Sequence, residues 1–435
     1  MSRFESLPAS HTFMKNITAV ILAAGLGTRM KTEIPKVLHR VGSKTILDRI
    51  VSNFKKAGIK KIIAVVGYKA ELVEKAFEDE VDFVRQPELL GSGNALACAV
   101  EHIKDPDPEI LVTCGDTPLI TAETYERLIK AYLQEKVSCG FLTCRVQEPL
   151  SYGRIVRDKS GEIERIVEEK DASNEEKKIN EINVGTYCFR GSELREFINA
   201  IEINKKKKEF YLTDIVEILA RNGKKVLTQE CGAEEAIGIN SRKDLAEVNK
   251  MVNQKTIEKL MESGVTVIDP DNAYIDETAE IGKDTIIFPG TVIERDVKIA
   301  DNCKIGPFAR LRPGTRISRG AEVGNFVELC RAEIGEGAKV KHHTYLGDTV
   351  VGKDANIGAG TITANYDGKN KYPTVIGEGA FIGVGAILIA PVKIGKNAQV
   401  GAGSVVTKNK DVKDGQTVVG VPARPFTAGK GVKNG

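Results

Sequence analysis

Short runs of β-branched residues alternate with amphipathic stretches over residues 16–240. Three of these runs predict buried strands, at Ile17–Ala24, Ile62–Val66 and Ile110–Thr113. Apolar residues at helical spacing predict a helix after each strand, at Thr45–Ala57, Lys69–Glu78 and Ala122–Leu133. Alternating strands and helices indicate a mostly parallel sheet with crossover helices. Ligands of such sheets bind at the carboxyl ends of the strands.

The pattern changes twice after residue 240. Residues 241–264 are charged, contain no Gly or Pro before Gly264, and predict a linker helix. Over residues 265–420 an aliphatic residue, usually followed by Gly, recurs every six positions, as at Ile305-Gly306. This period predicts a parallel β-helix whose coils each hold three hexapeptides, with aliphatic side chains inside and Gly at tight corners. The long break at 363–374 predicts an extruded loop, and two tails remain, at 1–15 and 421–435.

Composition narrows the classes of function. The 435 residues include 63 Lys and Arg against 60 Asp and Glu, 6% aromatic residues and no Trp. Because this chain has neither a basic excess nor an aromatic surface, we expect no nucleic-acid or membrane partner. The eight cysteines fit no zinc or disulfide framework, which indicates a reducing cytoplasm. No apolar run approaches the ~20 residues that a membrane span needs.

A Gly-rich segment, from Leu22 to Lys36, follows the first predicted strand. Its backbone N–H groups suit a phosphate, although its spacing matches neither the Walker nor the dinucleotide-binding motif. Arg29 and Lys36 place two cations beside this loop. Asp116 follows the third predicted strand, where a carboxylate suits Mg²⁺ next to phosphates. The segment and Asp116 together therefore indicate a phosphate-binding site with a divalent cation.

Residues 22–36 resemble the signature of the sugar-1-phosphate nucleotidyltransferases, and further segments follow in that family's order, at 86–95, 115–116, 152–154, 168–171, 181–183, 211–214 and 238–240. The second half carries further matching segments, at 305–314, 324–328, 342–348, 356–361 and 365–368. The layout over residues 17–407 is similar to the bifunctional UDP-N-acetylglucosamine pyrophosphorylase / glucosamine-1-phosphate N-acetyltransferase family. This resemblance implies a Rossmann-like α/β nucleotidyltransferase domain joined by a helical arm to a left-handed parallel β-helix.

The resemblance implies uridylyl transfer from UTP to N-acetylglucosamine-1-phosphate in the first domain, with release of pyrophosphate. Arg29 and Lys36 would stabilise the phosphates, and Asp116 and Asn240 would hold Mg²⁺. The residues implied to bind UTP and the sugar are Leu22, Ala23, Ala24, Gly25, Lys36, Gln86, Gly91, Ser92, Gly153, Glu168, Asn183 and Asn240.

The resemblance implies acetyl transfer from acetyl-CoA to glucosamine-1-phosphate in the β-helix. His342 is the implied general base, since an imidazole titrates near neutral pH and the attacking amine must lose a proton. The residues implied to bind substrate are Arg312, Tyr345, Asn356, Lys371, Asn365, Tyr366, Ala359 and Ala402. Such sites form between subunits, so the resemblance also implies a homotrimer acting on small-molecule substrates.

Three positions depart from the family pattern in the second half. Cys330 replaces a Lys that binds the sugar phosphate, Val384 replaces a Ser, and Gly420 replaces an Arg that meets the coenzyme. Two alternatives to the bifunctional enzyme therefore stay open. In one the β-helix is only a trimerisation scaffold for a uridylyltransferase, and in the other the second site takes a related amino sugar or acyl donor.

Overall fold

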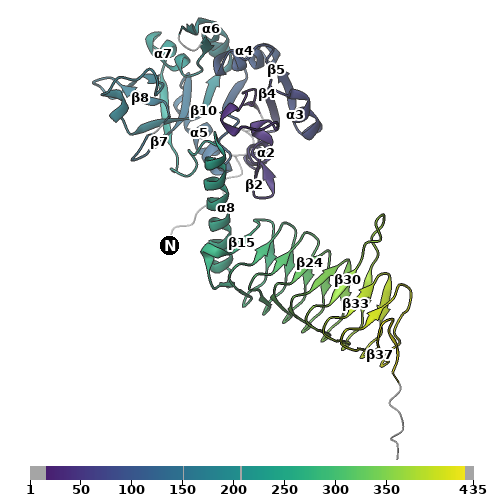
Figure 1. Cartoon of the computed structure of the whole chain (residues 1–435). Coiled ribbons are helices and arrows are strands. Elements are labelled where there is room, and N and C mark those ends of the chain that lie inside the picture. Colours follow the sequence, from purple (N-terminus) through teal and green to yellow (C-terminus); the bar gives the residue numbers. More distant parts are fainter. Residues whose placement is uncertain (1–15, 150, 206–207, 427–435) are drawn as a thin grey trace, which may run out of the picture. The chain divides into compact units, whose positions relative to one another are not determined.

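The structure is a computed structural model that describes residues 16–149, 151–205 and 208–426 (Figure 1). The predicted tail 1–15, and residues 427–435 of the predicted tail 421–435, lie outside the described residues. The chain divides into two compact units, one ending at Val248 and the other beginning at Asn249. Among the described residues, no helix combines the length and apolar character needed to cross a membrane.

The first unit is built on a sheet with strand order β13-β7-β10-β6-β1-β4-β5, with β8 and β9 attached beside β10. Strand β1 (Ile17–Leu22) pairs in parallel with β4 (Lys61–Val66) and β6 (Glu109–Cys114), as predicted. Strand β10 (Glu181–Arg190) runs antiparallel to its neighbours, so the sheet is mixed but mostly parallel. The other strands are β5 (Asp82–Arg85), β7 (Cys139–Arg145), β8 (Arg154–Arg157), β9 (Ile163–Val167) and β13 (Val226–Glu230).

The three predicted helices are present with slightly different ends, as α2 (Ile46–Lys56), α3 (Ala70–Ala76) and α5 (Ala122–Glu135). Helix α2 begins with a capping box, in which Asp48 N donates to Thr45 Oγ1 and Thr45 N donates to Asp48 Oδ2. Helix α4 buries Ala95, Leu96 and Ala99 in one apolar core with residues of β1 and β4. The other helices of this unit are α4 (Ser92–His102), α6 (Gly191–Phe197) and α7 (Asp214–Arg221).

A long helix, α8 (Arg242–Glu262), fills most of the predicted linker. Asp244 in its first turn accepts hydrogen bonds from the backbone N–H groups of Asn240 and Ser241, at 2.9 and 2.8 Å. These bonds satisfy two N–H groups just before the helix and fix the backbone of Asn240. Gly264, with a φ of 95°, follows the helix in the left-handed region that ends many helices.

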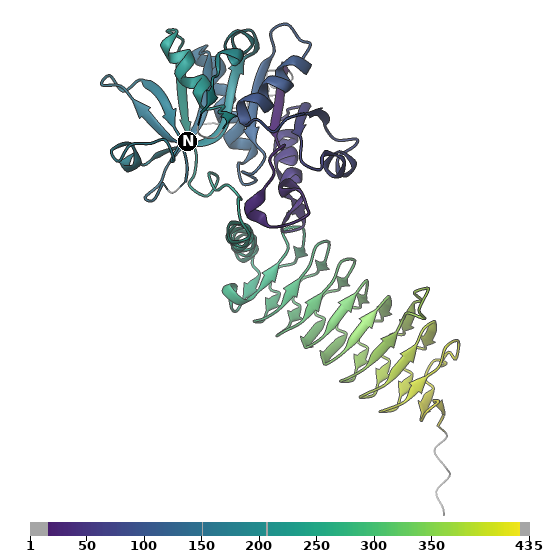
Figure 2. The same cartoon turned by 45° about the horizontal axis from the view of Figure 1, so that its top comes forward.

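The second unit is a parallel β-helix, in which successive coils add strands to each of three sheets (Figure 2). The predicted inward positions are buried in one continuous core, from Ile299 to Val406, and Ile281 is partly buried against it. The predicted role of Gly at the corners is confirmed at Gly358, where a Cβ would lie 2.6 Å from the carbonyl oxygen of Ile382 in the next coil. Because these contacts repeat from coil to coil, the fold explains the hexapeptide period of the sequence.

Coil length varies along the β-helix, which decides where its side chains align. The sheet that carries His342 includes β23 (Glu322–Asn325), β26 (Lys339–His342), β29 (Asn356–Ile357), β32 (Phe381–Ile382), β35 (Gln399–Val400) and β37 (Thr417–Val419). The pairing of Lys339 with Asn356 gives a coil of 17 residues, and the pairing of Asn356 with Phe381 gives one of 25. The longer coil contains the predicted loop, between β30 (Ile362–Ala364) and β31 (Thr374–Ile376).

Candidate active sites

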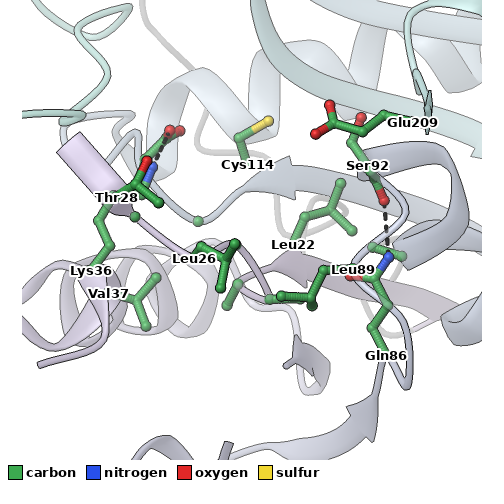
Figure 3. Close-up of a pocket in the computed structure, with 18 residues that line it drawn as sticks. Leu22, Leu26, Thr28, Lys36, Val37, Gln86, Leu89, Ser92, Cys114 and Glu209 are labelled. Carbon is green, nitrogen blue, oxygen red and sulfur yellow. Dashed lines mark hydrogen bonds and ion pairs between the residues drawn. The ribbon is translucent and has the colours of Figure 1, made fainter. Parts of the chain in front are cut away.

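A cavity of about 410 Å³ lies at the carboxyl ends of β1 and β6 (Figure 3). Figure 3 shows Lys36 and Thr28 at one end and Gln86 and Ser92 at the other, with apolar side chains of Leu22, Leu26 and Leu89 between them. The predicted residues that line this cavity are Leu22, Ala23, Ala24, Gly25, Lys36, Gln86, Gly91, Ser92 and Asp116. A cavity with a cationic end, an apolar middle and an amide at the far end suits a nucleotide.

The cationic end brings together three predicted residues that lie far apart in the sequence. Lys36 Nζ lies 2.7 Å from Asp116 Oδ2 and 3.3 Å from Asn240 Oδ1. The Lys36 and Asp116 side chains are only 17% and 22% exposed, so solvent screens this ion pair weakly. A carboxylate oxygen and an amide oxygen therefore converge on one cation, which is the donor set that Mg²⁺ prefers.

A second cavity, of about 880 Å³, adjoins the first, since Thr28 and Glu209 line both. Arg29, Glu168 and Asn240 line it, as do Tyr152, Tyr211 and Asp244. Tyr152 Oη accepts a hydrogen bond from Gly238 N at 3.1 Å, which ties residues 151–153 to the segment that carries Asn240. The two cavities together give room for a nucleotide and a second substrate beside Lys36.

The end of the first cavity that contains Gln86 lies at the start of α4. Gln86 is 5% exposed, and its Nε2 donates to Gly91 O at 3.0 Å and to Asn94 Oδ1 at 2.8 Å. Gly91 has a φ of 99° and a ψ of 179°, and a Cβ there would lie 2.6 Å from Phe210 O, so only Gly fits. Ser92 Oγ accepts from Leu212 N at 3.0 Å, which holds residues 210–212 against this helix end.

Of the remaining predicted sugar-binding residues, Glu168 lines the second cavity. Thr213 Oγ1 donates to Glu168 Oε1 at 3.1 Å, and burial raises the pKa of Glu168. Gly153 and Asn183 line neither of these two cavities, and Asn183 N donates to Gly153 O at 2.9 Å. Asn183 Nδ2 donates to Tyr187 Oη at 2.7 Å, so this amide is bound within its own strand.

A carboxyl group close to Glu168 has a raised pKa. Burial, reinforced by the charges of Glu217, Glu168 and Asp171, raises the pKa of Asp214 to about 6. Burial also raises the pKa of the Cys114 thiol, beside Asp116, to about 12, so this cysteine stays protonated at neutral pH.

In the β-helix, several predicted residues occupy the same place in successive coils. Gly360 N donates to His342 O, Gly385 N to Ala359 O, and Gly403 N to Val384 O, so each position stacks on the previous one. Coil lengths of 17, 25 and 18 residues put His342, Ala359, Val384 and Ala402 into one column. One of the three departures from the family pattern, Val384, therefore shares this column with the predicted base. Gly420 instead contacts the next corner, where its N donates to Ser404 Oγ and its O accepts from Val405 N.

A neighbouring sheet carries the third departure. Arg312 Nη1 donates to Glu328 Oε1 at 3.0 Å, and Cys330 and Glu328 raise the pKa of Arg312. Arg331 makes a two-pronged ion pair with Asp348, at 2.5 and 2.8 Å, and its Nη1 lies 3.0 Å from Cys330 Sγ. The positive charge of Arg331, next to Cys330 in the sequence, is thus already paired with the carboxylate of Asp348.

The other predicted acetyl-site residues are spread over several coils. Asn365 Nδ2 donates to Asp348 Oδ2 at 2.5 Å, and Arg331, with a smaller contribution from the charge of Lys371, lowers the pKa of Asp348. Tyr345 pairs with Glu328 and with Ile362 in the sheet, and Tyr366 is 60% exposed on the extruded loop. Asn356 lies on β29, one coil beyond Lys339.

Sequence reasoning missed lining residues that no motif marks. Glu209 lines both cavities from a two-residue strand, β12 (Glu209–Phe210), beside a run of lysines that gave no signal. Asp244 belongs to the predicted charged linker helix, but it also lines the second cavity and fixes Asn240. The available sign of that role is Ser241 three residues before it. The two residues bond reciprocally, as in a capping box, since Asp244 N donates to Ser241 Oγ at 3.2 Å and Ser241 N donates to Asp244 Oδ2.

Comparison with known proteins covers both units. Residues 19–179 match the MobA-like NTP transferase domain, and residues 278–313 and 373–408 match the bacterial transferase hexapeptide family (six repeats). The bifunctional protein GlmU of Carboxydothermus hydrogenoformans is 44% identical over 86% of this chain and 91% of its own length. Those of Clostridium beijerinckii and Clostridioides difficile are 42% and 39% identical, over 92% and 93% of this chain and 95% of their own lengths. With this identity extending through both units, the chain belongs to the family of the bifunctional protein GlmU.

Proposed function

We propose that this chain makes UDP-N-acetylglucosamine in two steps. The β-helix transfers an acetyl group from acetyl-CoA to the amine of glucosamine-1-phosphate. The first unit then joins the product to UTP and releases pyrophosphate. The main support is the convergence of Lys36, Asp116 and Asn240 at one end of a nucleotide-sized cavity, in a chain whose relatives are bifunctional.

In the uridylyl step, a phosphate oxygen of the sugar attacks the α-phosphorus of UTP, and the bond to the pyrophosphate breaks. Phosphoryl-type transfers of this kind need charge neutralisation and alignment more than covalent help. Arg29 and Lys36 would supply cations to the phosphates, while Gln86 and Gly91 lie at the other end of the cavity to receive the base. Glu168 and Asn183 would position the sugar.

Mg²⁺ is the cation that this site fits. The Lys36 ammonium, within reach of both Asp116 Oδ2 and Asn240 Oδ1, is a cation already held by the two oxygen atoms proposed as ligands. When bound, Mg²⁺ would neutralise negative charge on phosphate oxygens. Asp244 keeps the Asn240 backbone in place for this task, because it accepts from Asn240 N.

In the acetyl step, His342 takes a proton from the substrate amine as the nitrogen attacks the thioester carbon, and coenzyme A leaves as the thiol. Arg312, Tyr345, Asn356 and Lys371 would bind the sugar phosphate. Asn365 and Tyr366 would border the sugar, and Ala359 and Ala402 would face the coenzyme along the column below His342.

We further propose that the enzyme is a cytoplasmic homotrimer assembled through the β-helix. All eight cysteines are free thiols, in keeping with a reducing compartment. Exposed aliphatic side chains along one sheet, Ile362 and Ile387 in register, are available for contact with another subunit. Sedimentation at micromolar concentration should give three times the chain mass of 47.3 kDa.

The deciding experiment measures release of the coenzyme A thiol from acetyl-CoA and glucosamine-1-phosphate, without UTP. We expect release by the intact protein, its loss in His342→Ala, and its retention in His343→Leu. No release, together with normal pyrophosphate production from UTP and N-acetylglucosamine-1-phosphate, would contradict the acetyl half of the proposal. Substituting other amino-sugar phosphates and acyl-CoA donors in that assay would then separate a changed substrate from a scaffold.

A further inference from the structure

A side-chain pair beside the proposed base has no role in the function described so far. Asn325 and His342 are cross-strand partners at the ends of β23 and β26, and His342 Nδ1 lies 2.7 Å from Asn325 Oδ1. An amide oxygen only accepts hydrogen bonds, so Nδ1 must carry the proton that is shared. In a neutral imidazole the other nitrogen, Nε2, is then left with a free lone pair.

We propose that Asn325 is a positioning residue that fixes His342 in the tautomer able to act as a base through Nε2. This inference rests on the proposed acetyl transfer. In the part of the chain that the structure describes, Nε2 has no hydrogen-bond partner, and His342 is exposed. The free lone pair is therefore available to a substrate amine.

A column of ring side chains follows this pair in the chain. Phe308, Phe326 and His343 stack in successive coils, with ring centroids 5.4 Å apart for Phe308–Phe326 and 5.0 Å apart for Phe326–His343. Phe308 and Phe326 are 55% and 52% exposed, so burial does not explain the stack. The His343 ring is thus engaged by Phe326, and His342 is the imidazole bound to Asn325.

The backbone of that column is left-handed in each coil. Phe308, Phe326 and His343 have φ values of 54°, 56° and 44°, and the corresponding corner of the next coils holds Gly360 and Gly385. Positive φ values recur elsewhere in the β-helix, as at Asp348, so the coil geometry imposes this conformation.

The charged side chains near Asn325 and His342 do not take the place of the Asn325 amide as the partner of His342 Nδ1. The charged side chains on the same two strands are Glu322, Lys339 and Lys341, and Lys341 Nζ pairs with Glu322 Oε2 at 2.7 Å. Lys304 lies on the strand before them, β20 (Lys304–Ile305), while β29 on the other side carries Asn356 and Ile357. His343, the adjacent imidazole, stacks on Phe326 and serves as a matched control.

The tautomer can be measured directly on the full chain. With ¹⁵N-labelled histidine, long-range ¹H–¹⁵N correlations distinguish protonated from free ring nitrogens, and the five histidines are few enough to assign with His342→Gln. We expect a protonated Nδ1 and a free Nε2 at His342 in the wild type. A protonated Nε2 there would overturn the proposal.

Two variants then test the consequence for catalysis. Asn325→Leu removes the acceptor at similar size, and we expect the Nδ1 proton to be lost from His342 and kcat for acetyl transfer to fall at least tenfold, with KM little changed. Asn325→Asp places a carboxylate against Nδ1, and we expect the acidic limb of the kcat/KM profile to move to higher pH. An unchanged tautomer and pH profile in both variants would overturn the proposal.

The uridylyl reaction of the same molecules is the control for folding, because its site lies in the other unit and should keep its rate. His343→Leu should leave the tautomer of His342 and the pH profile unchanged. If the wild type releases no coenzyme A, the proposed acetyl transfer fails, while the tautomer measurement still decides the role of Asn325.

Discussion

Cys330 stands where the family pattern has a Lys, on the proposed sugar-phosphate side of the acetyl site. Arg331 lies against its sulfur, but both prongs of the guanidinium are bound to Asp348. We predict that Cys330→Lys lowers KM for glucosamine-1-phosphate by about tenfold, since a charge-assisted hydrogen bond contributes ~1.5–3 kcal/mol. Initial-rate kinetics would check this, with KM for acetyl-CoA unchanged.

Cys330→Ser is the matched control, because it keeps the size and adds no charge. Its KM for the sugar phosphate should equal that of the wild type. An equal KM in Cys330→Lys as well would mean that Arg331 leaves Asp348 and serves the phosphate itself.

Asp214 links protonation to stability in the first unit. Its pKa of about 6 in the folded chain lies above the ordinary value of 3.8. The protonated carboxyl therefore adds stability that is fully present below about pH 4 and is lost as the pH rises through 6. We predict that Asp214→Asn gains stability relative to the wild type, by about 1 kcal/mol between pH 4 and pH 8, after allowance for solvent screening.

Urea unfolding at several pH values would measure this difference. Asp158→Asn is the control of opposite sign, because Ser160 and nearby backbone N–H groups lower the pKa of Asp158. Its stability relative to the wild type should fall as the pH rises. A pH-independent difference for Asp214→Asn would contradict a raised pKa.

At the scale of elements, the start of α4 depends on one residue conformation. Gly91→Ala would place a methyl group 2.6 Å from Phe210 O in a backbone region open only to Gly. We predict a loss of roughly 2–3 kcal/mol in the free energy of unfolding and a higher KM for UTP. Gly223→Ala, with a φ of 69° but open space around it, should cost only about 1 kcal/mol and spare KM. Denaturation and initial rates would separate the two variants.

The elements differ in how far they can be predicted from the sequence. The β-helix was predictable because each hexapeptide repeats one local environment, so Leu311 and Val340 mark the inside by position alone. The strands and helices around β1 follow from local periodicity. Lys36 and Asp116 follow from a Gly-rich segment and a strand end, whereas Asn240, 204 positions from Lys36, is indicated only by the family resemblance. The engagement of Arg331 by Asp348 depends on packing between coils, which no sequence spacing reveals.

At the scale of the whole molecule, the two proposed reactions use separate units of one chain. We predict that Asp116→Ala abolishes uridylyl transfer and spares acetyl transfer, because it removes a proposed metal ligand and the partner of Lys36. His342→Ala should do the reverse, because it removes only the proposed base. Pyrophosphate and thiol assays on the same preparations would check both. Loss of both activities in either variant would contradict the assignment of two sites.

The regular spacing of the coils also sets the distances between side chains along the β-helix. Neighbouring strands in a sheet lie about 4.8 Å apart, so each coil moves the next side chain of the column one such step away from His342. Val384 is two steps from His342, about 10 Å. That distance does not let Val384 touch the nitrogen that loses its proton in the proposed acetyl step. We therefore expect the change at Val384 to alter how tightly the acyl donor binds and to leave the reacting end of the site unchanged.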